Sequence, residues 1–172
     1  MPKMRACALP VFVELGGDGI QTSKYNVSRD VEKRSYGGHV FDSVMEMRFF
    51  RDVILPQVES GQILRYELQK PYELQPKFEH CGKSVRPITY VADFYIEYSD
   101  GHAEVIDTKG AADSVAKMKR KMMWYTYPDV VYKWITYVKK WGGWLDWEEV
   151  NRLRKEAKRD KRTKREEEDA HE

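Results

Sequence analysis

The alternation of apolar and polar residues predicts its clearest element over residues 83–110, "KSVRPITYVADFYIEYSDGHAEVIDTKG". The first arm is rich in the β-branched and aromatic residues that favour strands. "SDG" at 99–101 is a strong turn signal, and "HAEVIDTKG" supplies the second arm. The pattern therefore predicts an antiparallel hairpin in which Asp93 lies opposite position 107 on the neighbouring strand.

A helical spacing of apolar residues precedes this hairpin, over "VMEMRFFRDVILPQV" at 44–58. Asp42 or Ser43 is the expected N-cap, since both side chains accept hydrogen bonds from free N–H groups at a helix start. Pro56 and Gly61 are expected to end this helix. Residues 61–78 then read as extended segments that are interrupted by prolines at 71 and 76.

A second helix is predicted over 113–127, ended by Pro128, and a further strand over 129–138. The order of helix, strands, helix and strand is typical of an α/β protein with a mixed sheet. Residues 1–22 are predicted to form an N-terminal extension, 23–150 the folded domain, and 151–172 a charged C-terminal helix and tail. Residues 23–36 read as an extended arm.

Composition narrows the class of protein. The 172 residues suit one domain, and the 41% apolar and 13% aromatic content excludes global disorder. The two cysteines have no metal-ligand spacing and favour a reducing cytoplasm. No apolar run reaches the roughly 20 residues of a membrane span, so no membrane partner is expected.

Charge is distributed unevenly along the chain. Nine basic and two acidic residues lie between Arg152 and Arg165, and an acidic run follows at 166–169. This composition predicts a solvated helix that frays into a disordered tail. "WGGWLDW" at 141–147 is expected to pack under the C-terminal helix or into a dimer contact.

Two further basic segments are candidate contacts to nucleic-acid phosphates. Their basic side chains are Lys24, Arg29, Lys33 and Arg34 in the arm and Lys117, Lys119, Arg120 and Lys121 in the second helix. In that helix Val115, Met118 and Met122 are expected to pack inward. The alternative interpretation is that these basic residues form solvated surfaces with no ligand.

Candidate chemistry gathers around the predicted hairpin. Asp93, Asp107 and Lys109 fall near one point of the paired strands, and Glu46 lies beside the apolar stripe of the first helix. Close carboxylates raise each other's pKa unless a cation lies between them, and Mg²⁺ suits such oxygen ligands. The alternatives are that Asp93 caps a turn or pairs with Arg86, and that Glu46 pairs with a basic residue on its helix surface.

These residues resemble the signature of the PD-(D/E)XK nuclease superfamily. "VAD" and "VIDTKG" carry its two acids and its lysine at Asp93, Asp107 and Lys109, and Glu46 matches the glutamate of its first core helix. "KYNV…FDSVMEMRFF", "YELQPKFE", "RPITYVADFYIEY" and "WYTYP" extend the likeness to a phage and prophage family related to Holliday-junction resolvases, over about residues 24–135. One departure is that Ala92, and not proline, precedes the first acid.

The resemblance implies a restriction-endonuclease-like mixed β-sheet flanked by helices, and it implies roles for the residues. Asp93 and Asp107 would bind Mg²⁺ or Mn²⁺ together with the Thr108 carbonyl. Glu46 would bind metal directly or through water, and Lys109 would activate water or stabilise charge on the phosphate. Gln75 is a further candidate for holding the water or the lysine, and its alternative is a polar residue at a strand edge.

The expected function is metal-dependent hydrolysis of DNA phosphodiesters, selective for four-way or other branched junctions in phage DNA processing. The resemblance further implies a homodimer and, for a phage protein, the cytoplasm of the bacterial host. No small-molecule cofactor is expected. The alternatives are a general nicking or double-strand endonuclease, a transposase-like end-cutting subunit, and a noncatalytic DNA-binding module.

Overall fold

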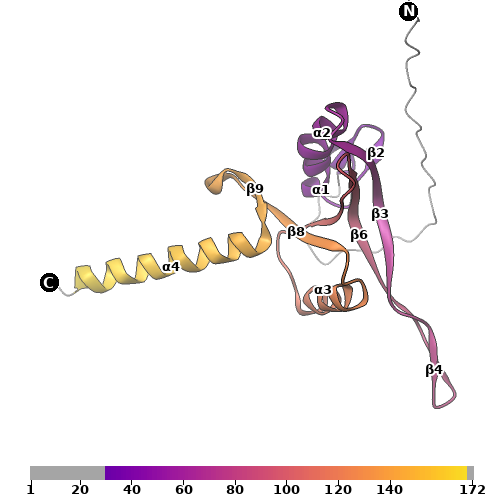
Figure 1. The fold of residues 1–172 in the computed structure, drawn as a ribbon. Helices are drawn as coiled ribbons and strands as arrows, with labels where there is room; N and C mark the ends of the chain where they lie inside the picture. Colours follow the sequence, from indigo (N-terminus) through magenta and orange to yellow (C-terminus); the bar gives the residue numbers. More distant parts are fainter. Residues whose placement is uncertain (1–29, 170–172) are drawn as a thin grey trace, which may run out of the picture.

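A five-stranded mixed sheet carries the fold in the computed structural model, which describes residues 30–169 (Figure 1). The strand order is β3-β6-β7-β8-β9; β7 and β8 are parallel, and the other neighbours are antiparallel. The strands are β3 (Ile63–Gln75), β6 (Ile88–Tyr98), β7 (Ala103–Thr108), β8 (Val131–Val138) and β9 (Gly143–Asp146). Helices flank this sheet, so the predicted α/β class with a mixed sheet is confirmed, and it is consistent with a restriction-endonuclease-like fold.

The predicted hairpin forms between β6 and β7. Phe94 pairs with Ile106 and Glu97 with Ala103, which places Asp93 opposite Asp107 as the sequence predicted. The turn at Gly101, whose φ is +91°, takes the left-handed conformation that glycine adopts without a steric penalty. The two acids are therefore brought together by local strand pairing.

Strand β3 is longer than the sequence predicted. It runs without interruption through Pro71, which pairs in register with Val91 of β6. The predicted break at Pro71 is wrong because β3 is an edge strand, where a residue without an N–H group costs no ladder bond on the open side.

One helical run covers an end of the sheet as α1 (Val44–Phe49), the π-helical segment η2 (Phe50–Ile54) and α2 (Leu55–Glu59). Ser43 is its N-cap and accepts a hydrogen bond from the backbone N–H of Glu46. Pro56 lies inside the run and does not end it. The wider π turn before it relaxes the clash that a proline ring makes with the preceding helical turn.

The described part of the predicted arm is folded, not extended. It forms the short helix η1 (Glu32–Arg34) and the strand β1 (Ser35–Tyr36), which pairs with β2 (His39–Val40). The prediction of an extended arm is therefore wrong for η1, although β1 itself is an extended strand. Residues 23–29 of the predicted arm lie outside the described residues, as do residues 1–22.

The helix α3 (Ser114–Thr126) forms where the sequence predicted it, but it is rotated from the expected orientation. Arg120 and Met123 are its buried residues, whereas Val115 and Met118 are each 53% exposed. The inward packing expected of these two apolar residues is wrong, whereas Met122 packs against the core as predicted. The aromatic rings of Trp124 and Trp134 provide a cation–π environment that draws Arg120 inward instead.

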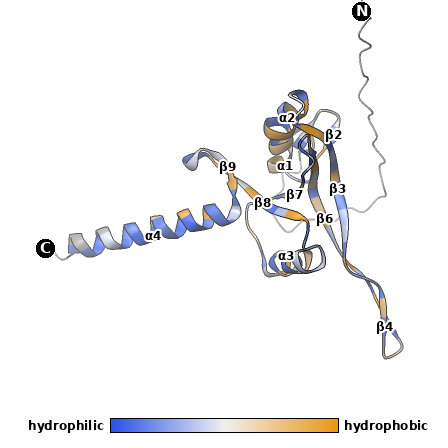
Figure 2. Ribbon diagram, in the orientation of Figure 1, coloured by the Kyte–Doolittle hydropathy of each residue, from blue (hydrophilic) through white to orange (hydrophobic). Residues whose placement is uncertain are grey.

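The helix α4 (Trp147–Asp169) extends away from the sheet and is mostly hydrophilic (Figures 1 and 2). Only its first turns join the body, through the buried Val150 and the contact of Trp147 with the ring of Trp134. Trp147, the first residue of α4, packs at the junction of this helix with the sheet, as the sequence predicted. Trp144 of β9 instead contacts Phe49 of α1, so the prediction that it packs under the C-terminal helix is wrong. The helix continues to Asp169 and does not fray within the charged run.

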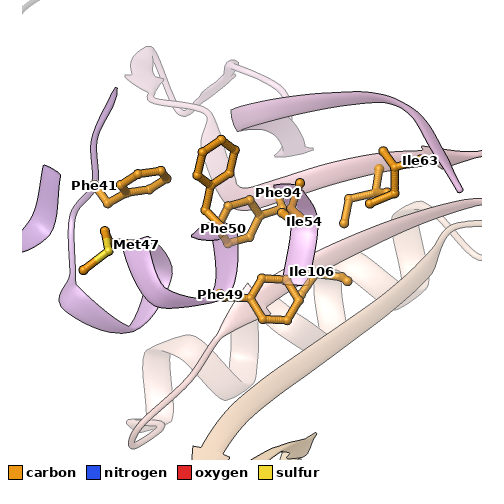
Figure 3. Packing of buried hydrophobic residues seen from close by; sticks show 9 residues of the cluster. Phe41, Met47, Phe49, Phe50, Ile54, Ile63, Phe94 and Ile106 are labelled. Atoms are coloured by element: carbon orange, nitrogen blue, oxygen red, sulfur yellow. The ribbon is translucent and has the colours of Figure 1, made fainter. Parts of the chain in front are cut away.

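Two clusters of buried residues form the core. The first packs α1 and η2 against β6 and β7, and Figure 3 shows Phe49, Phe50 and Ile54 gathered around Phe94 and Ile106. The second packs α3 against the other part of the sheet; its buried members are Tyr72, Leu74, Tyr90, Ala92, Val105, Met123, Tyr132 and Trp134.

A separate two-stranded hairpin continues β3 and β6 beyond the sheet (Figure 1). It consists of β4 (Phe78–His80) and β5 (Lys83–Val85), which pair only with each other. None of the helices described between residues 30 and 169 is long and apolar enough to cross a membrane.

Candidate active site

The two acids of the predicted signature meet where β6 and β7 separate. The β6–β7 ladder ends at the pair of Phe94 with Ile106. Beyond this pair, side-chain carboxylates take the place of backbone carbonyls as hydrogen-bond acceptors. The Asp93 backbone N–H donates to Asp107 Oδ1 at 3.0 Å, and the Thr108 backbone N–H donates to Asp93 Oδ2 at 2.8 Å. Each acid therefore fixes the other's strand, and the pair is part of the sheet itself.

A buried chain of hydrogen bonds holds Asp107 from its other side. The Tyr132 hydroxyl donates to Asp107 Oδ2 at 2.9 Å, and it is itself bonded to the Tyr90 hydroxyl and to the indole N–H of Trp134. Asp107 is 2% exposed. Because a buried carboxylate needs its lone pairs satisfied, these partners fix its rotamer and orientation.

Glu46 reaches the same region from the first turn of α1. It is 6% exposed, and its carboxylate accepts hydrogen bonds from the Ser43 hydroxyl at 2.7 Å and the Asp42 backbone N–H at 3.2 Å. The arrangement resembles a capping box, in which an N-cap serine and a glutamate three residues later satisfy each other's N–H groups. The alternative interpretation, in which Glu46 pairs with a basic residue on the helix surface, is therefore wrong.

Gln69 was not predicted and lies beside this group. Its side-chain amide is 3.5 Å from Glu46 Oε2, and in the β3–β6 register it stands opposite Asp93. Its φ of +53° is unusual for a residue other than glycine. The boundary between the two core clusters crosses β3 and β6 at this point. Leu68 and Phe94, on one side, belong to the first cluster, and Tyr72 and Ala92, on the other side, belong to the second. The acids therefore lie at the boundary between the two halves of the core.

Lys109 follows β7 and continues its parallel pairing, since its backbone N–H donates to the Ile135 carbonyl at 2.7 Å. Its ammonium group lies 5.4 Å from the centre of the Trp134 ring. From there its charge lowers the pKa of both Asp93 and Asp107. Lys109 is thus the cation that the sequence placed beside the two acids.

Burial and crowding of negative charge raise the pKa values of the acids. Loss of hydration, and then the charge of Asp93, raise the pKa of Glu46 to about 8. Loss of hydration raises the pKa of Asp93 to about 6, against the opposing effect of its bonds from Thr108. Asp107 also has a pKa of about 6, raised by burial and held down by the Asp93 N–H, Lys109 and Tyr132.

This donor set fits a hard divalent cation. As they stand, no three His, Cys, Asp or Glu side chains within residues 30–169 form a ready-made metal cluster. Mg²⁺, however, is usually bound by one or two protein carboxylates and completes its shell with water and substrate phosphate. Asp93 and Asp107 form such a pair. Burial raises their pKa values because it disfavours the charged carboxylates, and a bound cation would stabilise that charged form.

Two other predicted site residues have different outcomes. Thr108 lies at the site, where its N–H and its hydroxyl both donate to Asp93. Gln75 does not reach it: it pairs with Ile88, and its amide donates to the Pro76 carbonyl at 3.4 Å. Asp93 lies five positions further along the strand than Ile88, which is roughly 16 Å. The site role predicted for Gln75 is therefore wrong, and its alternative as a polar strand-edge residue holds.

The predicted basic contacts divide into exposed and structural residues. Lys117 and Lys121 are exposed on α3, and Lys33 is exposed beside Asp30. Lys24 and Arg29 lie outside the described residues. The other three side chains donate hydrogen bonds within the fold. Arg34 donates to the Phe41 carbonyl, Lys119 to the Thr89 carbonyl, and Arg120 to the Glu148 carboxylate.

Arg120 is the clearest correction among them. It is 7% exposed, and its charge lowers the pKa of Asp107. The sequence around Arg120 does not indicate that it is buried, because Trp134 of β8, which covers it, is distant in the sequence. Tyr132 and Trp134 were missed for the same reason, although their alternation in "VYKW" did indicate a shared strand face.

Fold and site together define an α/β protein of restriction-endonuclease-like architecture with a buried group of acids and one lysine. The chain belongs to the family described as "Protein of unknown function (DUF1064)", whose model matches residues 22–143. That range includes Glu46, Gln69, Asp93, Asp107 and Lys109. No match was found among curated proteins.

Proposed function

We propose that this protein is a metal-dependent DNA endonuclease that acts preferentially on four-way or other branched junctions. The observation that carries the proposal is the convergence of Asp93, Asp107 and Lys109, with Glu46, at the point where β6 and β7 separate. The preference for branched DNA, and a homodimer that would cut two strands symmetrically, rest on the resemblance to resolvase-like nucleases.

In this proposal Asp93 and Asp107 hold Mg²⁺ or Mn²⁺, with Glu46 joining directly or through water. The bound cation would supply Lewis-acid polarisation of the phosphate and a water of lowered pKa. The Lys109 ammonium binds a non-bridging phosphate oxygen and opposes the charge that grows there as water attacks phosphorus. Tyr132 and Thr108 keep the two carboxylates oriented toward the same point.

The exposed lysines of α3 support a polyanionic substrate. Lys117 and Lys121 are four residues apart, so they project from one face of this helix. Contacts of this kind position a phosphate backbone and carry no sequence information. Selection would then depend on the shape of the DNA and on the arrangement of two subunits.

The test incubates the purified full-length protein with a synthetic four-way junction and with a linear duplex of matched sequence, in Mg²⁺ or in EDTA. We expect symmetric cuts in the junction that require Mg²⁺. Asp107→Asn and Lys109→Ala should each slow cleavage by about 100-fold or more, the scale of losing one charge-stabilising group. Glu104→Gln is the matched control, because Glu104 lies on the same strand but bonds Lys133 away from the site.

Each other outcome removes a defined part of the proposal. Equal cutting of junction and duplex would remove the structural preference and leave a general endonuclease. DNA binding without any cleavage, in Mg²⁺ or Mn²⁺, would indicate a noncatalytic binding module. Full activity of both site variants would show that the residue assignment itself is wrong. Sedimentation of the protein alone measures whether the homodimer exists.

A further inference from the structure

The β4–β5 hairpin lies outside both clusters of the core. It projects from the end of the long β3–β6 ribbon, away from both α1 and α4 (Figure 1). All three residues of β4 are exposed, and β5 has only Val85 half-buried. A two-stranded hairpin of this size has little stability of its own in water. Burial of apolar side chains therefore does not explain why this hairpin forms.

The hairpin is stiffened at both ends. Its two-residue turn, Cys81-Gly82, has positive φ at both positions, +49° and +72°, as in the turn type that matches the twist of paired strands. Pro76 and Pro87 fix the backbone at its base. A rigid hairpin loses little conformational entropy when it binds a ligand.

α3 braces the strands from which the hairpin emerges. The Tyr127 hydroxyl at the end of this helix donates to the Glu73 carbonyl at 2.9 Å, and Lys119 donates to the Thr89 carbonyl at 2.8 Å. The Tyr72 and Tyr127 rings pack edge to face, with centres 5.2 Å apart. The ends of β3 and β6 from which the hairpin emerges are therefore fixed relative to the helix.

One face of the hairpin combines aromatic and basic side chains without an acid. Phe78 pairs with Val85 and His80 with Lys83, so alternation places these four side chains on one face. Glu79 pairs with Ser84 and points to the opposite face. Phe78 is 45% exposed and belongs to neither core cluster. An aromatic ring beside a lysine is a combination that binds unstacked bases and their phosphates.

The hairpin lies at a distance suited to a nucleic acid that also occupies the acid group. Phe78 is nine residues along the ribbon from Gln69, which stands opposite Asp93. At about 3.3 Å per residue this is roughly 30 Å, close to one turn of B-form DNA at about 34 Å.

We propose that the β4–β5 hairpin binds DNA at a branch point, where Phe78 stacks on a base that has lost its neighbour and Lys83 contacts an adjacent phosphate. Inside a continuous duplex both faces of each base are covered, so the ring has a partner only where stacking is interrupted. This inference rests on the proposed function and deepens it, because it names the device that would distinguish branched from linear DNA.

The test measures affinity by fluorescence anisotropy, with full-length protein carrying Lys109→Ala so that DNA stays intact in Mg²⁺. The probes are a four-way junction and a linear duplex of matched sequence. Phe78→Ala should weaken junction binding by about fivefold or more, the lower end for losing one base–aromatic stack, and leave duplex binding within about twofold. Lys83→Ala should weaken both and lower the salt slope of log K by about one.

Matched controls come from elsewhere on the surface. Tyr125→Ala removes an aromatic ring that is 90% exposed on α3, and Lys139→Ala removes an exposed lysine beyond β8. Both controls should leave binding within about twofold. Thermal melting of every variant checks that the fold is unchanged, which is expected because these side chains are exposed.

The outcomes separate this inference from the proposed nuclease activity. Unchanged junction affinity in Phe78→Ala, or an equal loss for junction and duplex, would overturn the stacking role while cleavage by the unmodified protein stood. A selective loss in a protein that never cuts DNA would support the hairpin and reject the nuclease. Absence of any DNA binding would overturn both.

Discussion

At the scale of single residues, Asp107 is the most constrained group of the candidate site. One carboxylate oxygen accepts the Asp93 N–H, and the other accepts the Tyr132 hydroxyl, which also binds Tyr90 and Trp134. Residues that orient a metal ligand typically change metal affinity by about 10- to 100-fold when they are removed. Tyr132 is therefore expected to act as a positioning residue.

Tyr132→Phe tests that role with little change in volume. Without the hydroxyl, Asp107 loses a hydrogen bond that favours its charged form, so its pKa should rise further. Mg²⁺ affinity should fall by about tenfold, and the rise of cleavage with pH should shift to higher pH. Titration calorimetry and pH–rate profiles measure the two effects.

The control for this variant is Tyr137→Phe, an exposed tyrosine of the same strand. It should leave both measurements unchanged. If Tyr132→Phe lowered only the melting temperature, with metal affinity and pH profile unchanged, the tyrosine would be a packing residue and not a positioning one.

At the scale of elements, one ion pair joins α4 to the body. Arg120 of α3 is buried between the rings of Trp124 and Trp134 and binds Glu148 in the first turn of α4. The Glu148 side chain is 55% exposed, so water partly screens the pair. Its main effect is to neutralise a guanidinium that the fold has already buried.

Removing the acid should therefore cost more than removing both charges. Glu148→Ala is expected to lower the free energy of unfolding by about 1 to 2 kcal/mol, because it leaves Arg120 buried without its partner. Arg120→Met combined with Glu148→Ala should restore part of that loss, since methionine fills the space without a charge. Urea denaturation measures all three proteins. Equal stability of the two variants would contradict this account.

At the scale of the whole molecule, the acid group opposes folding at neutral and alkaline pH. Folding raises the pKa of Glu46 from 4.5 to about 8, and those of Asp93 and Asp107 from 3.8 to about 6. The folded state therefore binds more protons than the unfolded chain between pH 4 and 8. The stability contributed by these protonated acids is complete below about pH 4 and is lost as pH rises through 6 to 8.

The metal-free protein should accordingly be less stable at pH 8 than at pH 5. Glu46→Gln should reduce this difference by roughly 1 to 3 kcal/mol, because it removes the group whose pKa is raised most. Mg²⁺ should restore stability more at pH 8 than at pH 5, since carboxylates must release their protons to bind it. Denaturation at both pH values, in EDTA and in Mg²⁺, gives the comparison.

Two results would contradict this prediction. One is an identical pH dependence in the native protein and Glu46→Gln, which would show that Glu46 ionises as an ordinary carboxyl. The other is a stabilising effect of Mg²⁺ that does not depend on pH, which would place the ion away from these acids.

Local sequence was sufficient for the features that depend on neighbours along the chain. The period of two in "VADFYIEY" and "AEVIDT", with the "SDG" turn between them, placed Asp93 opposite Asp107. The capping pattern restricted the N-cap of α1 to Asp42 or Ser43, and Ser43 takes that position. These predictions succeeded because strand alternation and helix capping are decided within a few residues.

Tertiary structure alone decided which distant residues surround that site. The parallel pairing of β7 with β8 brings Tyr132 and Trp134 to Asp107, and Gln69 enters through a left-handed conformation that no local pattern marks. Packing against Trp134 turns Arg120 inward, although its basic neighbours in the sequence suggested an exposed surface. The sequence by itself thus determined the acids and their register. Contacts between remote strands and helices, whose energies depend on the assembled core, determined how those acids are held, charged and covered.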